Sequence, residues 1–182
     1  FAMPPTDVTL LDRLTSRGVP VVAVGKVGDL FAGRGVLRSR PTVRDEQGMD
    51  IVLEEMASLA SGLVFANLVD FDTVYGHRND VEGYARNLER FDSRLQQVLD
   101  ALRDDDLLVV TADHGNDPTT PSTDHSREYV PLLACGARVS PDVRLGVRPT
   151  FADLGQTLAE NFAVDPLPSG TSFLEALRVD PA

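Results

Sequence analysis

The chain contains three histidines, and each one stands in a short polar segment close to aspartates. His77 follows Asp72 in DFDTVYGHR, His114 directly follows Asp113 in TADHGND, and His125 lies in TDHSRE. Imidazole and carboxylate groups together are the usual ligands of a catalytic divalent cation. This pairing of every histidine with acidic neighbours predicts a metal site.

Each of these segments also has a simpler interpretation when it is taken alone. Acids that follow a strand can cap the next helix, which would leave His77 on the surface. Asp113 and His114 are adjacent, so both reach one site only if the loop turns sharply, and Gly115 would permit such a turn. The chain between His114 and His125 is long and turn-rich enough to return to the same face. The three segments together favour one shared site.

Apolar runs that read as buried strands alternate with segments of helical periodicity. The strands are expected at 19–24, 63–69, 106–111 and 129–134. The helices are expected at 6–17, about 50–60, 80–102 with Asp80 as N-cap, 150–162, and in a short stretch after 173. The polar stretch 34–48 is expected to be a loop.

This alternation predicts an α/β fold, with a mostly parallel sheet and helices on both of its faces. One α/β unit is expected over residues 1–182, with no separate second domain. Functional loops in such sheets collect at the carboxyl ends of the strands. Because Asp72 follows the strand at 63–69 and His114 follows the strand at 106–111, both clusters are expected at one edge of the sheet.

Composition excludes several classes of partner. The net charge of −11 argues against nucleic acid or an anionic membrane as a partner, since both require basic surface. The sequence has no apolar run long enough to span a membrane, and its start lacks the features of a signal peptide. The absence of Met at position 1 favours a trimmed or excised segment. The single Cys135 cannot form an internal disulfide and is expected to be buried, which fits a cytoplasmic location.

Three segments closely resemble the phosphopentomutase family of the alkaline phosphatase superfamily. They are NLVDFDTVYGHRNDVEGYARNLERFDSRL, DDLLVVTADHGNDPTTPSTDHSREYVPLL and TFADLGQTLAENF, and the resemblance extends from about Val8 to Leu174. The pattern VDFDxxYGHRxDVEGY separates this family from most other members of the superfamily. The resemblance implies an alkaline phosphatase-like core, of which this chain matches only the C-terminal part, with the cap domain absent.

The resemblance also implies an activity and its cofactors. Members of the family are intramolecular phosphotransferases of nucleoside catabolism. They interconvert ribose 1-phosphate and ribose 5-phosphate, or the 2-deoxy forms, through a phosphothreonine. They use two divalent ions, usually manganese. Carried over to this sequence, Asp72, His77 and His125 would bind one ion, and Asp113 and His114 the other.

Further polar residues are assigned less directly. Lys26, the only lysine, stands just after a predicted strand and reads as a surface residue when taken alone. Its position resembles one that contacts the distal phosphate of the substrate in the family. Four polar neighbours of the proposed ligands are expected to orient those ligands or to cap loops. They are Asp70, Asn116, Asp117 and Asp124.

The sequence departs from the family pattern in one respect. The family's core begins with a strand that ends in a metal-binding Asp, followed by the Thr nucleophile, and neither precedes Val8 here. We therefore expect the chain to be inactive alone and to require the N-terminal portion of the same protein as a partner. Two alternatives stay open. One is another metalloenzyme of the superfamily, such as a phosphatase, a phosphodiesterase or a cofactor-independent phosphoglycerate mutase. The other is a non-catalytic metal-binding remnant.

Overall fold

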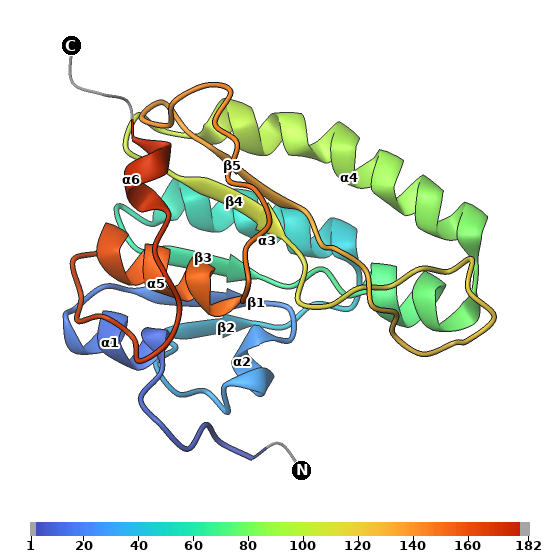
Figure 1. Cartoon of the computed structure of the whole chain (residues 1–182), viewed down its shortest axis with the longest axis horizontal. Coiled ribbons are helices and arrows are strands. Elements are labelled where there is room, and N and C mark those ends of the chain that lie inside the picture. Colours follow the sequence, from blue (N-terminus) through green and yellow to red (C-terminus); the bar gives the residue numbers. More distant parts are fainter. Residues whose placement is uncertain (1–2, 179–182) are drawn as a thin grey trace.

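A computed structural model describes residues 3–178 of the chain (Figure 1). Its helices are α1 (Leu10–Ser16), α2 (Val27–Leu30), α3 (Asp45–Ser58), the π-helix η1 (Phe71–Tyr75), the 3-10 helix η2 (Gly76–Arg78), α4 (Val81–Ala101), α5 (Ala152–Asn161) and α6 (Leu174–Leu177). Its strands are β1 (Val21–Val24), β2 (Arg38–Arg40), β3 (Leu63–Ala66), β4 (Leu108–Thr111) and β5 (Leu132–Cys135).

The first three strands form a parallel sheet in the order β2-β1-β3. The central strand β1 aligns Val22 with Arg38 of β2 on one side and with Val64 of β3 on the other. The last two strands pair with each other and run antiparallel. The expected α/β fold with a mostly parallel sheet is therefore confirmed, while the strand predicted at 129–134 begins later and runs in the opposite direction.

The alternating side chains of β1 build a core on each face of the parallel sheet. Val21 packs with Leu11 and Leu14 of α1 and with Ala159 of α5 on one face. On the other face, Val22 and Val24 pack against Ile51 of α3. In Figure 1 the long helix α4 lies outside α3, so that α3 is enclosed between α4 and the sheet. Both faces are covered by helices, as the alternation of elements predicts.

The expectation of a loop at 34–48 is wrong. This stretch contains β2 and the first turn of α3. The sequence does not predict strand β2, because its residues are polar. The strand is stabilised by contacts with a buried acid of α3. Arg38 and Arg40 both form ion pairs with Glu55 of α3, whose side chain is only 2% exposed. A carboxylate that pairs two guanidinium groups compensates for its own burial.

The parallel arrangement makes β1 and β3 end at the same edge of the sheet, and the chain leaves β3 there through η1 and η2. Asn79 then takes a left-handed conformation with φ of 51°, and Asp80 caps α4 as predicted by accepting a hydrogen bond from the Gly83 N–H. Figure 1 shows the loop after β4 passing beside this green segment. Among residues 3–178, no helix is both long and apolar enough to cross a bilayer.

Candidate metal centre

Asp72 is the central residue of the cluster at this edge. Its Oδ1 atom lies 3.2 Å from His77 Nε2 and 3.1 Å from His125 Nε2. The Asn116 side-chain amide donates a hydrogen bond of 3.1 Å to the same oxygen. Three side chains from two segments of the chain thus converge on one carboxylate oxygen.

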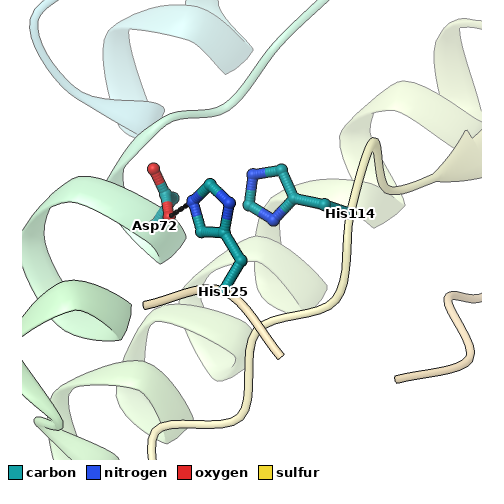
Figure 2. A group of neighbouring side chains, drawn as sticks. All are labelled: Asp72, His114 and His125. Carbon is teal, nitrogen blue, oxygen red and sulfur yellow. Dashed lines mark ion pairs between the residues drawn. The ribbon is translucent and has the colours of Figure 1, made fainter. Parts of the chain in front are cut away.

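The third histidine lies directly against this group. The rings of His114 and His125 are stacked with their centroids 3.7 Å apart (Figure 2). Asp72, His114 and His125 each offer one ligand atom within 4.8 Å of the others, so His114 lies within reach of the group around Asp72. Asp113 stands beside His114, with 3.8 Å between its Oδ1 and the His114 Nε2, and its side chain is largely exposed. The fold therefore brings Asp72, His77, His114 and His125 together, whereas Asp113 contacts only its neighbour His114.

The loop that carries His114 and His125 is closed by its own polar contacts. Gly115 and Ser126 form an antiparallel bridge, in which the Ser126 N–H donates to the Gly115 carbonyl. The Ser126 hydroxyl in turn accepts a hydrogen bond of 2.8 Å from the Asp117 N–H. These contacts return the chain to the place where it left β4, as the spacing predicts.

Gly76 and Gly115 stand next to His77 and His114. They are needed for the space that they leave and not for a left-handed backbone conformation. Gly76 has φ of −60°, an ordinary helical value, and Gly115 lies outside the left-handed region. A Cβ at Gly76 would stand 2.1 Å from the Asn116 side-chain nitrogen, and a Cβ at Gly115 would stand 2.4 Å from the Ser126 carbonyl oxygen. Both glycines make room for a close neighbour, and the chain bends as expected at Asp113 and His114 without a left-handed glycine.

The site carries negative charge and is open to solvent. Burial raises the pKa of Tyr84, and the nearby carboxylates of Asp72 and Asp117 raise it further. The His125 side chain is 47% exposed and that of His77 is 39% exposed. A negative, accessible group of oxygen and nitrogen atoms suits a hydrated divalent cation.

The polar neighbours fall into two groups. Asn116 contacts a proposed ligand directly, as expected, whereas Asp117 accepts hydrogen bonds from Thr119 and Asp124 lies in the exposed loop. The hydrogen bonds from Thr119 lower the pKa of Asp117. Asp70 is buried and accepts a hydrogen bond from the backbone N–H of Asp45. Neither the residue type nor the sequence position of Asp45 predicts a role near the site. The sequence also does not predict the contact between His77 and the Thr123 carbonyl, because a residue of any type at position 123 would supply a main-chain carbonyl.

Lys26 follows β1 at the same sheet edge as Asp72. Gly25 packs against the main chain of Asn67, where a Cβ would stand 2.3 Å from the carbonyl oxygen. This contact places the segment after β1 beside the segment after β3. The Lys26 side chain is exposed and contributes no atom to the group around Asp72.

Several known proteins are similar to this chain in sequence. The chain is 56% identical over 174 residues to the phosphopentomutase of Thermotoga petrophila, a match that covers 95% of this chain and 45% of that protein. It is 50% identical to the phosphopentomutase of Caldanaerobacter subterraneus over 177 residues, covering 97% of this chain and 45% of that protein. The chain thus spans a little under half the length of these relatives.

A solved structure of Leishmania mexicana phosphoglycerate mutase, determined at low cobalt concentration, has the same fold. The TM-score is 0.70 at 21% identity, over 89% of this chain and 38% of that one. The family model of the metalloenzyme superfamily matches residues 11–166, which is most of the chain. Because this match covers more than half of the chain, the chain belongs to the metalloenzyme superfamily.

Proposed function

We propose that this chain is the C-terminal part of the catalytic core of a phosphopentomutase. The complete enzyme interconverts ribose 1-phosphate and ribose 5-phosphate, or their 2-deoxy forms, through a phosphothreonine. The observation that carries the proposal is the convergence of Asp72, His114 and His125 on one point, in a chain more than half identical to phosphopentomutases. A group of this composition suits phosphoryl transfer, in which cations stabilise the charge on the transferred group.

The distances around Asp72 support its assignment as a metal ligand together with His77 and His125. Two ligands that each lie about 2.1 Å from an ion, at angles of about 90–110°, are about 3.0–3.4 Å apart. The distances from Asp72 Oδ1 to His77 Nε2 and to His125 Nε2, 3.2 Å and 3.1 Å, fall within this interval. The side chains are therefore spaced as edges of a coordination polyhedron.

The hydrogen bond of His77 supports the same assignment. Its Nδ1 lies 2.6 Å from the Thr123 carbonyl oxygen, and a carbonyl can only accept, so Nδ1 carries the proton. In the neutral ring, Nε2 then presents its lone pair to the Asp72 carboxylate. A cation bound between these two acceptors would satisfy both, which is the role proposed for the metal. A carbonyl that orients a histidine in this way is a common feature of metal sites.

A second ion is proposed at Asp113 and His114. These residues are adjacent to the first group because the His114 ring stacks on His125. When bound, ions held by these residues would supply positive charge that stabilises the transferred phosphoryl group. Manganese is proposed for both positions on the family resemblance, and mixed carboxylate and imidazole ligands are compatible with it.

Lys26 is proposed to bind the distal phosphate of the substrate. Its exposed ammonium group and its place at the sheet edge that carries Asp72 support this role. A lysine presents a mobile positive charge that suits a phosphate held away from the reacting group. The family resemblance selects this position.

The nucleophile is proposed to lie in the portion of the relatives that this chain does not span. Four hydroxyl groups in β4 and the loop after it are engaged in local hydrogen bonds, which supports this assignment. The Thr111 hydroxyl donates to the Pro131 carbonyl. The Thr119 and Thr120 hydroxyls donate to Asp117, and the Ser126 hydroxyl accepts a hydrogen bond from the Asp117 backbone N–H. These hydrogen bonds stabilise the loop.

The remaining portion of the enzyme is also the proposed partner of this chain. Within residues 3–178, one side of β3 and one side of β4 have no paired strand. Phe65 of β3 is 40% exposed, which is unusual in a parallel sheet that helices cover on both faces. A further segment of the protein would cover this surface. We therefore propose that the 182 residues alone do not turn over substrate.

The test is a coupled assay of the gene product that contains this chain, supplied with ribose 1-phosphate and Mn²⁺. We expect turnover, and we expect His114→Ala to lower kcat/KM by at least about 100-fold. The exposed Asp165 serves as a control, because Asp165→Ala removes a carboxylate outside the site. Turnover of phosphoglycerates without turnover of pentose phosphates would overturn the proposed substrate, and full activity of His114→Ala would overturn the proposed site.

A further inference from the structure

A buried polar network lies behind the proposed metal site, and none of its members belongs to that site. Asp45 and Asp70 are 7% and 6% exposed, and each accepts a hydrogen bond from the backbone N–H of the other, at 2.9 Å and 3.0 Å. Asn87 of α4, which is 4% exposed, donates its amide to the second oxygen of Asp45 at 2.8 Å. The network joins the start of α3, the end of the β3 loop and α4.

The same network continues to the far end of the π-helix. The Arg90 guanidinium donates one hydrogen bond of 3.0 Å to the side-chain oxygen Oδ1 of Asn87 and another of 2.8 Å to the Tyr75 hydroxyl. Asp70 immediately precedes the π-helix Phe71–Tyr75 and Tyr75 ends it. Both ends of this helix are therefore held by one continuous chain of hydrogen bonds, and Asp72 lies between them.

A π-helix is rarely stable by itself and occurs mostly at functional sites, so its shape must be imposed by its surroundings. The network is a costly way to provide stability alone. Burial raises the pKa of Asp45 and outweighs the hydrogen bonds from Asp70 and Asn87 that lower it, so ionised Asp45 is less favourable in the fold than in water. Apolar residues of similar volume often give equal or greater stability at such positions, whereas a fully bonded polar network specifies one geometry.

We infer that Asp45 and Asn87 are positioning residues that set the orientation of Asp72 toward the cation. This inference rests on the proposed metal role of Asp72. Neither residue reaches the cation itself. They act through the π-helix, whose two ends they connect through Asp70 and Arg90. Metal affinity then depends on residues buried between α3 and α4.

The hydrogen-bond directions permit a sharp test by exchange of the two side chains. In Asp45→Asn, an amide nitrogen faces the Asn87 amide nitrogen, and rotation of Asn87 only moves the donor–donor conflict to Arg90. In Asn87→Asp, two carboxylates face each other. In the double variant Asp45→Asn/Asn87→Asp, the new amide at position 45 would donate to the new carboxylate at position 87. That carboxylate would still accept from Arg90, so every donor regains an acceptor.

The experiment measures the Mn²⁺ dissociation constant by calorimetry for these three variants of the full chain. Amide hydrogen exchange of residues 70–77 is followed in the metal-free proteins. We expect each single variant to weaken Mn²⁺ binding about 10–100-fold and to speed exchange in 70–77. The double variant is expected to return to within about threefold of the wild type. Tyr75→Phe, which removes only the hydroxyl at the outer end, is expected to fold normally and to lose about threefold in affinity.

The control is Glu55→Gln, a change at another buried acid of α3 that pairs with Arg38 and Arg40 away from the site. This variant is expected to lose stability in urea and to keep its Mn²⁺ affinity. Single variants that lose stability, yet bind Mn²⁺ and exchange like the wild type, would reduce the network to a structural role and overturn the inference. A wild-type chain that binds no Mn²⁺ would instead refute the metal site, while the exchange data would still decide whether the network holds the π-helix.

Discussion

Gly76→Ala tests whether the site depends on the contact between η2 and Asn116. The backbone at Gly76 has φ of −60° and ψ of −59°, so alanine fits it without strain. The added Cβ would stand 2.1 Å from the Asn116 amide nitrogen and 2.6 Å from its Cγ atom. Asn116 must therefore move, and it then loses the hydrogen bond of 3.1 Å to Asp72 Oδ1.

The size of the effect follows from that lost hydrogen bond. A hydrogen bond to a charged group contributes about 1.5–3 kcal/mol. At about 1.4 kcal/mol for each factor of ten, this sets an upper limit of about 100-fold on the loss in Mn²⁺ affinity, reached when the bond acts only in the metal-bound state. The metal-free fold should lose stability as well, although alanine suits the helical backbone, because the Asn116–Asp72 hydrogen bond is present without the ion.

The assay is calorimetric titration with Mn²⁺, together with urea unfolding in the presence of a chelator. The matched control is Gly155→Ala, in which the added Cβ meets only a methyl group of Leu167 at 3.2 Å. Asn116→Ala should weaken binding by the same factor, and adding Gly76→Ala to it should cause no further loss. The reasoning is refuted if Gly76→Ala binds Mn²⁺ like the wild type, or if the two losses add.

Three further predictions concern stability. Leu14→Ala, at a side chain with 0% exposure in the α1–α5 core, should cost about 2–5 kcal/mol in urea unfolding, and a loss below about 1 kcal/mol would contradict the packing. Burial of Asp12 raises its pKa, but hydrogen bonds from Thr9 and Arg34 outweigh this and hold the pKa below its ordinary value. Its contribution is therefore present at neutral pH and lost as the pH falls through the lowered value, so Asp12→Asn should reduce stability by about 1 kcal/mol at pH 7 and show a weaker acid dependence. Mn²⁺ at about a hundredfold excess over its dissociation constant should add about 2.7 kcal/mol to the unfolding free energy, a gain that EDTA reverses and that His125→Ala lacks in thermal melts.

The sequence predicts the main helices and buried strands because their signals are local. The run 19–24 is apolar throughout and forms β1, and the long amphipathic pattern after Asp80 forms α4 with the predicted N-cap. The strand β2 escaped prediction, since Arg38, Ser39 and Arg40 carry no hydrophobic signal. Only its pairing with β1 and the ion pairs with Glu55 make it a strand.

Tertiary contacts also decide the purpose of the two glycines beside the histidines. In the sequence, Gly76 and Gly115 both resemble turn residues. In the fold, each lies against a neighbour distant along the chain, Asn116 in one case and Ser126 in the other. Such a steric requirement comes from the packing partner and leaves no mark at the glycine itself.

Residue type and spacing alone determined which side chains could bind a cation, because every histidine stands near an aspartate and follows or faces the end of a strand. β4 pairs with β5 and not with the sheet that contains β3, so the two clusters do not follow strands of one sheet as expected. The packing of the loop after β4 beside the segment after β3 decided that Asp72, His114 and His125 meet within 4.8 Å. The network from Asp45 to Tyr75 could be found only in three dimensions. Its members are spread over helices α3 and α4 and the π-helix, and hydrogen bonds between such distant residues depend on how the helices pack.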